Sequence, residues 1–328
     1  MIQNLVSMMS VLITGGLGFI GINTVQELVS EDFQVVIVDR KKDPKILNEV
    51  LDSSQQKVKF FCCDILNLDC LNRVARDVEY ILHLAAIVSV VEVNEKPSLA
   101  FRVNVDGTHN ILLFSRINDN IEKVVFASSA AVYGNPLYVP IPENHPLKPI
   151  SLYGLTKVLG EKLVRWYHEI YGLDYVILRY FNVYGPYMAT SKYPNVILGF
   201  LMKAIKNEPL IIYGDGTQTR GFVYVKDVAR ANLLAIKKNT IGEFNVGTGI
   251  ETTIAELANL IIRMLDSSSN IVFSEWREGD IKRSVADIKK ITGSLGWKPV
   301  VSIESGLKYT IAWLKKCSFF HNFYNRAQ

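Results

Sequence analysis

The chain has 328 residues, enough for two domains or for one large α/β unit with a smaller lobe. Hydrophobic residues make up 49% and charged residues 21%, which excludes a disordered chain. The formal net charge of +4 is the difference between 36 basic and 32 acidic residues, and the short basic clusters are scattered along the sequence, so no nucleic-acid partner is indicated.

The N-terminal segment has no basic leader and no cleavage site, and its apolar run is too short to span a membrane. We therefore expect a cytoplasmic protein without membrane contact. The first strand begins only near Ser10, which leaves Met1, Met8 or Met9 as the start of translation.

The cysteines lack the spacing of zinc ligands, and no metal site is indicated. We expect all four to be buried, reduced thiols: Cys62, Cys63, Cys70 and Cys317.

Apolar β-type runs alternate with helical patterns through the first half of the chain. We expect strands, buried on both faces, at 10–15, 34–39, 57–64, 80–86, 123–129 and 175–181. Helices are predicted between them at 19–30, 69–76, 95–118 and 152–171. This order predicts an α/β fold with a doubly wound parallel sheet.

The alternation lapses after about residue 183, which predicts a smaller C-terminal lobe. The segment 220–236 is expected to return to the main sheet. We therefore predict a cofactor domain over 1–183 together with about 222–249, and a substrate-binding lobe over the rest of 184–328.

The segment "VLITGGLGFIG" follows the first strand and opens a helix, the context of a Rossmann dinucleotide-binding loop. It contains Gly16-x-Gly18-x-x-Gly21, and Gly15 adds a second glycine register. Glycines permit a tight turn and close backbone approach to a pyrophosphate, which the helix N-terminus attracts.

Asp39 ends the second strand 18 residues after Gly21, close to the spacing of about 20 expected for a ribose-binding carboxylate. A carboxylate repels a 2′-phosphate and favours NAD. The neighbouring Arg40 leaves NADP open as an alternative.

Seven motifs, "TGGLGFIG", "CDI", "HLAA", "NVDGT", "SSAAVYG", "YGLTK" and "RYFNVYGP", occur in this order. Together they closely resemble the extended short-chain dehydrogenase/reductase superfamily over about 10–315, and within it the UDP-sugar 4-epimerases. The resemblance implies NAD as cofactor. It also implies that the cofactor contacts are Gly15, Gly18, Phe19, Ile20, Gly21, Asp39, Arg40, Asp64, Ile65, Leu84, Ala85, Ala86, Asn104, Ser128, Tyr153, Lys157 and Tyr180.

Tyr153 and Lys157 stand four residues apart, on one face of a predicted helix. A free tyrosine, with a pKa of ~10, is a poor base at neutral pH, but a nearby ammonium and a positive nicotinamide ring favour the phenolate. The resemblance implies that Tyr153 exchanges a proton with the sugar hydroxyl and that Lys157 also binds the nicotinamide ribose. Ser129 aligns with the catalytic Ser/Thr of the family and would hydrogen-bond the same sugar hydroxyl.

Ala130 and Ala131 follow Ser129, where the similar 4,6-dehydratases carry an Asp-Glu pair and UDP-glucuronate decarboxylases usually have a glutamate. Alanines cannot carry protons, which favours epimerisation at carbon 4 of a UDP-hexose through a transient 4-keto sugar. Another nucleotide-sugar enzyme of the superfamily is an alternative: a UDP-glucuronate epimerase, 2-epimerase, dehydratase or reductase. A non-enzymatic NAD-sensing regulator is a second alternative, although such sensors usually lack the Tyr–Lys pair.

The segments "GDGTQTRGFVYVKD" and "WREGDIKRSVAD" resemble the nucleotide-sugar clamps of this family. Arg220 and Arg277 would hold the pyrophosphate because a guanidinium fork matches its oxygens, and Asp280 would orient one of these groups or the ribose. Tyr213 would pack on uracil. The other substrate contacts that the resemblance implies are Ser89, Ser129, Asn182, Asn195, Val196 and Ser284.

Ser284 matches a position where members restricted to UDP-glucose and UDP-galactose often have a tyrosine. A serine leaves room for an acetamido group on carbon 2 of the sugar, so we expect UDP-N-acetylglucosamine to be accepted too. The helices near 95–118 and 152–171 resemble those that pair subunits in the family, so a homodimer is predicted.

Overall fold

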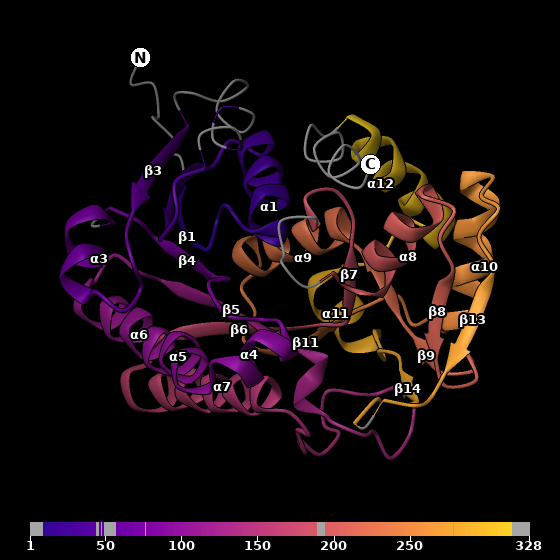
Figure 1. Ribbon diagram of the computed structural model, residues 1–328. Coiled ribbons are helices and arrows are strands. Elements are labelled where there is room, and N and C mark those ends of the chain that lie inside the picture. The colour runs from indigo at the N-terminus through magenta and orange to yellow at the C-terminus, as the bar shows by residue number, and fades with distance from the viewer. Residues whose placement is uncertain are drawn as a thin grey trace.

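The computed structural model describes residues 9–316 except 44–45, 47, 49–56, 76, 189–193 and 278. Its centre is a seven-stranded sheet in the order β11-β6-β5-β4-β1-β2-β3 (Figure 1). The strands are β1 (Ser10–Thr14), β2 (Gln34–Asp39), β3 (Val58–Cys62), β4 (Tyr80–His83), β5 (Lys123–Ser129), β6 (Asp174–Tyr180) and β11 (Gly242–Val246). All neighbours in this sheet are parallel, so the predicted doubly wound fold is confirmed.

The strand order reverses at β1, because β2 follows on one side and β4 lies on the other. Ligands of open α/β sheets bind at the carboxyl ends of the strands beside such a reversal. The fold therefore places the predicted cofactor loop, which follows β1, at the expected position.

Helices cover both faces of the sheet. Successive residues of β1 point to opposite faces, so Val11 and Ile13 pack in one core cluster and Leu12 in the other. The first face carries α1 (Phe19–Ser30), α9 (Val225–Lys237) and α11 (Lys289–Leu295). The second carries α3 (Leu68–Val74), α6 (Gly107–Ile117) and α7 (Leu152–Tyr171), and α7 runs along the lower edge in Figure 1.

The helix predicted at 95–118 is preceded by a separate short helix and contains a π-helical turn. The elements are α4 (Val90–Glu95), α5 (Pro97–Phe101), a π-helical turn η1 (Arg102–Asp106) and then α6. Pro97 begins a new helix because its missing N–H is tolerated only in a first turn. Residues 97–117 are helical throughout, with the π-helical turn inside them, so the helix predicted at 95–118 is confirmed apart from its ends.

Two expectations fail around β3. This strand ends the sheet order, and its residues between Val58 and Cys62 are partly exposed because no further strand covers that side. Cys62 is exposed, while Cys63 and Cys70 form a disulfide whose Cα atoms lie 6.2 Å apart. The first turn of α3 brings Cys70 to Cys63, so the prediction of buried reduced thiols was wrong for these three residues; Cys317 lies outside the described residues.

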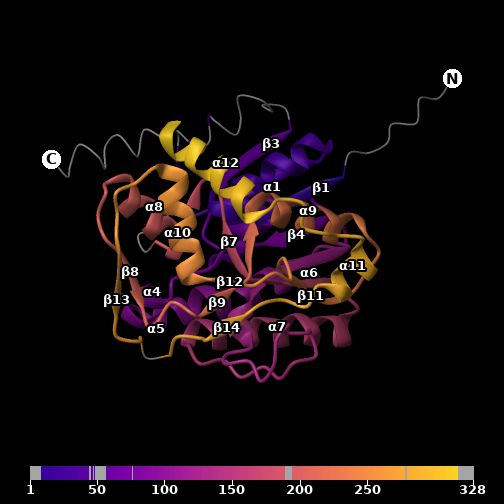
Figure 2. The ribbon, with the colours of Figure 1, turned by 90° about the vertical axis from the view of Figure 1, so that its right-hand side faces the viewer.

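The second lobe contains short sheets with helices packed around them (Figure 2). Its strand pairs are β7 (Asn182–Tyr184) with β10 (Phe222–Tyr224), and β8 (Leu210–Tyr213) with β13 (Ile271–Ser274). A third sheet joins β12 (Thr252–Thr253), β9 (Thr219–Arg220) and β14 (Arg283–Ser284). The helices α8 (Val196–Ile205), α10 (Ile254–Leu265) and α12 (Ile303–Lys316) pack around these strands.

The segment 220–236 returns to the main sheet in a different way from the one predicted. Its strand β10 pairs with β7 in a separate sheet, and its helix α9 packs on the α1 face. The strand that joins the main sheet is the next one, β11, beside β6. Within the described part of the chain, no helix combines the length and apolarity that crossing a membrane requires.

Candidate active site

The glycine loop, Gly15 to Gly21, packs directly against the residues that follow β4. Gly15 has φ +69°, and a Cβ on it would lie 2.9 Å from the Ala85 Cα atom. A Cβ on Gly21 would lie 2.4 Å from the Gly15 carbonyl oxygen, so this position also requires glycine. Gly18 is the N-cap of α1, and the first N–H groups of a helix have no partner within it. The N-terminus of α1, at Phe19 and Ile20, thus provides the donors that an anionic pyrophosphate needs.

Asp39 lies beside this loop. Its carboxylate accepts a hydrogen bond from the Leu17 N–H at 3.3 Å and another from the Lys41 N–H at 3.2 Å. Burial raises the pKa of Asp39, and these backbone donors oppose that effect. A carboxylate at this place fits a free ribose 2′-hydroxyl better than a 2′-phosphate, while Arg40 is exposed.

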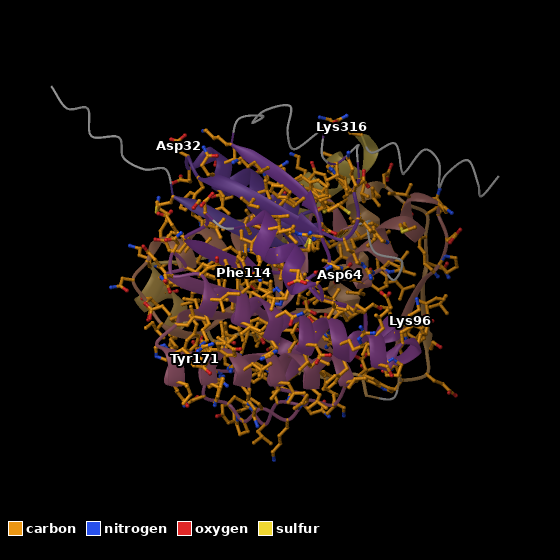
Figure 3. All side chains as sticks on the ribbon, turned by 90° about the vertical axis from the view of Figure 1, so that its left-hand side faces the viewer. Asp32, Asp64, Lys96, Phe114, Tyr171 and Lys316 are labelled. Carbon is orange, nitrogen blue, oxygen red and sulfur yellow. A yellow bond between two sulfur atoms is a disulfide. The ribbon has the colours of Figure 1, made fainter. Side chains whose placement is uncertain are left out.

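The residues predicted around the rest of the cofactor also follow strand ends. Asp64 is exposed after β3, as labelled in Figure 3, and accepts a hydrogen bond from the Leu66 N–H at 2.9 Å. Ile65 is buried next to it. Leu84, Ala85 and Ala86 follow β4 and are half-buried. Together with the glycine loop, this set fits a dinucleotide.

The helix α7, which carries Tyr153 and Lys157, packs closely on β5. Ser151 caps α7 by accepting a hydrogen bond from the Gly154 N–H at 3.1 Å. A Cβ on Gly154 would lie 2.5 Å from the Ala131 carbonyl oxygen, and one on Gly160 would lie 2.5 Å from the Phe126 ring. These glycines let α7 approach β5 more closely than larger residues would.

This approach brings the predicted triad together. Ser129 ends β5, and its hydroxyl hydrogen-bonds the phenol of Tyr153. The Lys157 ammonium donates to the carbonyl oxygen of Ala127 at 2.7 Å. The three side chains thus meet where β5 and α7 touch.

Burial shifts the pKa values of two members of this triad. Burial raises the pKa of Tyr153 to about 12, and the hydrogen bond with Ser129 opposes this. Burial lowers the pKa of Lys157 to about 8, against the attraction of Glu161. Burial of the phenol thus dominates its pKa among the protein groups. The expectation that the Lys157 ammonium and a bound nicotinamide ring together favour the phenolate stays a prediction.

Two predicted cofactor residues have hydroxyls that are bound elsewhere. Ser128 points to the opposite face of β5 from Ser129 and donates to the Glu161 Oε1 atom at 2.6 Å. Its side chain is 2% exposed and its hydroxyl is engaged by Glu161, while the predicted cofactor contact of Ser128 stays a prediction. Tyr180 donates to the Asn232 Oδ1 atom at 2.6 Å, and it lies close enough to Tyr153 for that group to raise its pKa.

A buried polar chain links the cofactor loop to α7. The His83 ring lies between Thr14 (Oγ1 to Nδ1, 2.7 Å) and Thr108 (Oγ1 to Nε2, 3.1 Å). Thr108 donates to the Asn104 carbonyl oxygen at 2.7 Å, and the Asn104 amide donates to the Thr156 hydroxyl at 3.1 Å. Asn104, in the π-helical turn, is therefore part of this chain, and its predicted place at the cofactor stays a prediction.

Sequence reasoning did not single out His83. Its position in "HLAA", directly before the cofactor residues that follow β4, was the available signal. Burial, and secondarily Lys157, lowers the pKa of His83 to about 3, so the ring is neutral at physiological pH.

In the second lobe, β9 and β14 bring several predicted substrate residues together. Arg220 donates to the Asp280 carboxylate at 2.6 Å and to the Ile281 carbonyl oxygen at 2.6 Å. Ser284 pairs with Arg220 across the two strands and is buried. Asp280 thus orients Arg220, one of the roles predicted for it.

Arg277 is stacked on the Tyr213 ring, with its Cζ atom 3.6 Å from the ring centroid. One face of this ring is therefore covered, and a base can pack on that face only if Arg277 moves. The remaining predicted substrate residues lie at element ends. Asn182 begins β7, Ser89 caps α4, and Asn195 caps α8, with the half-buried Val196 next to it.

A family model described as GDP-mannose 4,6-dehydratase matches residues 12–310. The chain belongs to this family of extended short-chain dehydrogenases/reductases. A relative named putative UDP-glucose 4-epimerase, from Methanocaldococcus jannaschii, is 42% identical over 93% of this chain and 98% of its own length. Another member, a UDP-N-acetyl-α-D-glucosaminuronate decarboxylase from Bacillus cytotoxicus, is 34% identical over 93% of this chain and 97% of its own length. The family therefore includes more than one reaction.

Solved structures of family members share the whole fold. The UDP-glucose 4-epimerase of Thermotoga maritima with UDP-glucose has a TM-score of 0.88 and 34% identity, covering 94% of this chain and 99% of that one. The UDP-N-acetylglucosamine 4-epimerase of Methanobrevibacter ruminantium, in complex with UDP-N-acetylmuramic acid, has a TM-score of 0.87 and 36% identity, with the same coverage. The UDP-glucose 4-epimerase of Thermus thermophilus in complex with NAD has a TM-score of 0.83 and 31% identity, covering 93% of this chain and 98% of that one.

Proposed function

We propose that the protein is an NAD-dependent isomerase that epimerises carbon 4 of a UDP-hexose. The observation that carries this proposal is the meeting of Ser129, Tyr153 and Lys157 beside a dinucleotide loop, with Ala130 and Ala131 directly after Ser129. Dehydration and decarboxylation need further acid or base groups at the sugar, and two methyl groups supply none. The names and bound ligands of the structural relatives support the same reaction class.

The cofactor would lie across the ends of β1 and β4. Gly15, Gly18 and the N-terminus of α1 would hold its pyrophosphate, and Asp39 would bind the adenosine ribose. When bound, NAD supplies the nicotinamide that takes a hydride from carbon 4 of the sugar and returns it to the other face. Lys157 would bind the nicotinamide ribose.

The chain's own groups would handle the proton. The Ser129 hydroxyl would hold the sugar hydroxyl on carbon 4, and the Tyr153 oxygen would take its proton and later give it back. With a pKa of about 12 the phenol is almost entirely protonated at neutral pH and cannot take the proton in that form, so a positive charge next to it is needed to favour the phenolate. The Lys157 ammonium would contribute that charge when it binds the ribose.

The second lobe would bind the nucleotide. Arg220, held by Asp280, would contact the pyrophosphate, and Arg277 would join it after leaving the Tyr213 ring, which then packs on uracil. Ser284 lies beside Arg220 and is small, which supports acceptance of 2-acetamido sugars as well as plain hexoses.

We also propose that a second copy of the chain covers the outer faces of α5 to α7. Several large apolar side chains of these helices are exposed: Phe101, Ile117, Leu155, Trp166 and Ile170. An apolar stripe of this kind on two adjacent helices fits a helix-to-helix dimer interface.

One experiment tests the reaction. The purified protein is incubated separately with UDP-glucose, UDP-N-acetylglucosamine and UDP-glucuronate, without added NAD, and the products are separated by anion-exchange chromatography and identified by NMR. We expect conversion to the 4-epimers of the first two at unchanged mass. A product lighter by water or carbon dioxide, or no conversion of any sugar by NAD-loaded protein, would overturn the proposal.

A further inference from the structure

Three side chains of α7, spaced four residues apart, contact three consecutive residues of β5. Tyr153 is hydrogen-bonded by Ser129, Lys157 donates to the Ala127 carbonyl oxygen, and Glu161 accepts from Ser128. The first two contacts belong to the catalytic triad. The third lies on the side of β5 away from the Ser129 hydroxyl.

We propose that Ser128 and Glu161 are positioning residues, whose buried hydrogen bond fixes α7 against β5 so that Tyr153 and Lys157 keep their places beside Ser129. This inference rests on the proposed epimerase function for the role of the triad. The contact itself is independent of which sugar is bound.

The Glu161 carboxylate is completely buried and accepts four hydrogen bonds. Its Oε1 atom accepts from the Ser128 hydroxyl at 2.6 Å and from Arg179 Nε at 2.8 Å. Its Oε2 atom accepts from Arg179 at 2.7 Å and from Arg165 at 2.7 Å. A carboxylate that is hydrogen-bonded at both oxygens has one available orientation. The contact of Ser128 with this carboxylate therefore fixes the position of α7 along β5.

Arg179 extends this hold to other parts of the site. Its second terminal nitrogen donates to the Tyr133 hydroxyl at 2.9 Å and to the Glu143 carbonyl oxygen at 2.8 Å. Tyr133 follows the η2 turn (Ala130–Val132) that succeeds Ser129, and it donates to the Asn245 Oδ1 atom of β11 at 2.6 Å. The same buried charge pair therefore anchors the strand end, the turn after it and the catalytic helix.

Packing alone does not require this arrangement. A buried ion pair is weak evidence for stability, because apolar residues of the same volume often stabilise a core as well or better. What an ion pair with saturated hydrogen bonds provides is a fixed geometry. Here that geometry is the register between the strand and helix that carry the triad.

Glu161 also acts on Lys157 through its charge, one turn further along α7. Burial lowers the pKa of Lys157, and the Glu161 carboxylate opposes this. The other charged or titratable groups around them are Arg165 on α7, Arg179 on β6, His83 on β4 and Glu243 on β11. Removing the Glu161 charge leaves Arg179 without its carboxylate partner, while Arg165 keeps Glu243, so we expect the pKa of Lys157 to fall further.

The decisive variant is Ser128→Ala, because it deletes one hydroxyl and leaves the Glu161–Arg179 pair intact. We expect kcat per folded, NAD-loaded site to fall about tenfold with KM nearly unchanged, and Ser128→Thr to restore most of it. Ser115→Ala is the matched control, because Ser115 is also a buried serine with one hydrogen bond, to the Ile111 carbonyl oxygen. A kcat for Ser128→Ala as high as that of Ser115→Ala would overturn the proposal.

A second variant, Glu161→Gln, uses a readout that does not need epimerisation. NAD affinity is measured by calorimetry from pH 6 to pH 10 for the wild type and the variant. If Lys157 binds the ribose as an ammonium, affinity falls as this group deprotonates, and we expect the fall to begin at lower pH in the variant. An unchanged NAD profile together with an unchanged kcat for Ser128→Ala refutes the positioning role even if the enzyme is an epimerase. A shifted profile in a protein that epimerises no sugar refutes the proposed function and leaves the positioning role standing.

Discussion

The Lys157 ammonium lies 2.7 Å from the carbonyl oxygen of Ala127, on the strand that ends at Ser129. This contact keeps the lysine beside the end of β5. If Lys157 binds the cofactor ribose as proposed, its ammonium has further N–H donors for that contact. The predictions below follow from this geometry and from the residues around it.

Tyr153→Phe should abolish turnover, by at least ~10²-fold, while the protein stays folded and keeps its NAD. The phenol is the proposed proton carrier, and the ring packing survives the change. Turnover of UDP-glucose, the circular dichroism spectrum and the NAD content are compared with the wild type. Turnover within tenfold of the wild type in folded protein would rule out this role.

Lys157→Ala should lower the NAD content of the purified protein, because the proposed ribose contact is lost. The cofactor is released by heat and quantified by chromatography. Lys162→Ala is a suitable control, since Lys162 lies on α7 and is exposed. Equal NAD content in the two variants would argue against the ribose contact.

The alkaline side of the pH profile should reflect Lys157. Its pKa is lowered to about 8, so it is charged below that pH and neutral above it. If the ammonium is the active form, kcat/KM falls as pH rises through this range. His83 cannot explain a change there, because its pKa is lowered to about 3. A profile that stays flat to pH 10 would contradict this assignment.

Ser284→Tyr should reduce turnover of UDP-N-acetylglucosamine at least tenfold more than turnover of UDP-glucose. The added ring would occupy the space proposed for the acetamido group, and overpacking costs about 1–3 kcal/mol. Ser284→Ala, which adds no volume, serves as the control. Equal losses for the two sugars would show that Ser284 does not select between them.

The protein should form a dimer in solution, with twice the 37.0 kDa mass of the chain. Trp166→Glu, on the exposed side of α7, should shift it toward the monomer by placing a charge in the apolar stripe. The particle masses of the wild type and of the Trp166→Glu variant are measured by light scattering at micromolar concentration. A wild type that scatters as a 37.0 kDa particle would refute the proposed interface.

Short sequence signals were enough to predict where α1 and α7 begin and end. The bounds of α1 and α7 match their predictions, because a glycine turn or a capping serine marks where each begins. The break at Pro97 was visible in the sequence, but the π-helical turn depends on Asn104 binding Ile87 and Thr156, which lie far from it in the chain.

In the candidate site, too, contacts between residues far apart in the chain could not be predicted from the sequence. Because successive side chains of a strand point to opposite faces, the sequence could have shown that Ser128 and Ser129 face opposite sides of β5. The partner of each hydroxyl, however, depends on where α7 packs. Glu161, Arg179 and His83 were missed because their roles arise from contacts between separate elements. The pairing of Arg277 with Tyr213 depends likewise on the fold of the second lobe.

The chain passes repeatedly between the sheet and the second lobe. It leaves the sheet after β6, returns as α9 and β11, leaves again for α10, returns as α11, and ends in the lobe at α12. No single cut can therefore separate the two parts, and a fragment ending after β6 would lack the strand that completes one edge of the sheet. The lobe is joined to the sheet by several crossings of the chain rather than by one linker, so any movement between the two parts must bend all of these crossings together.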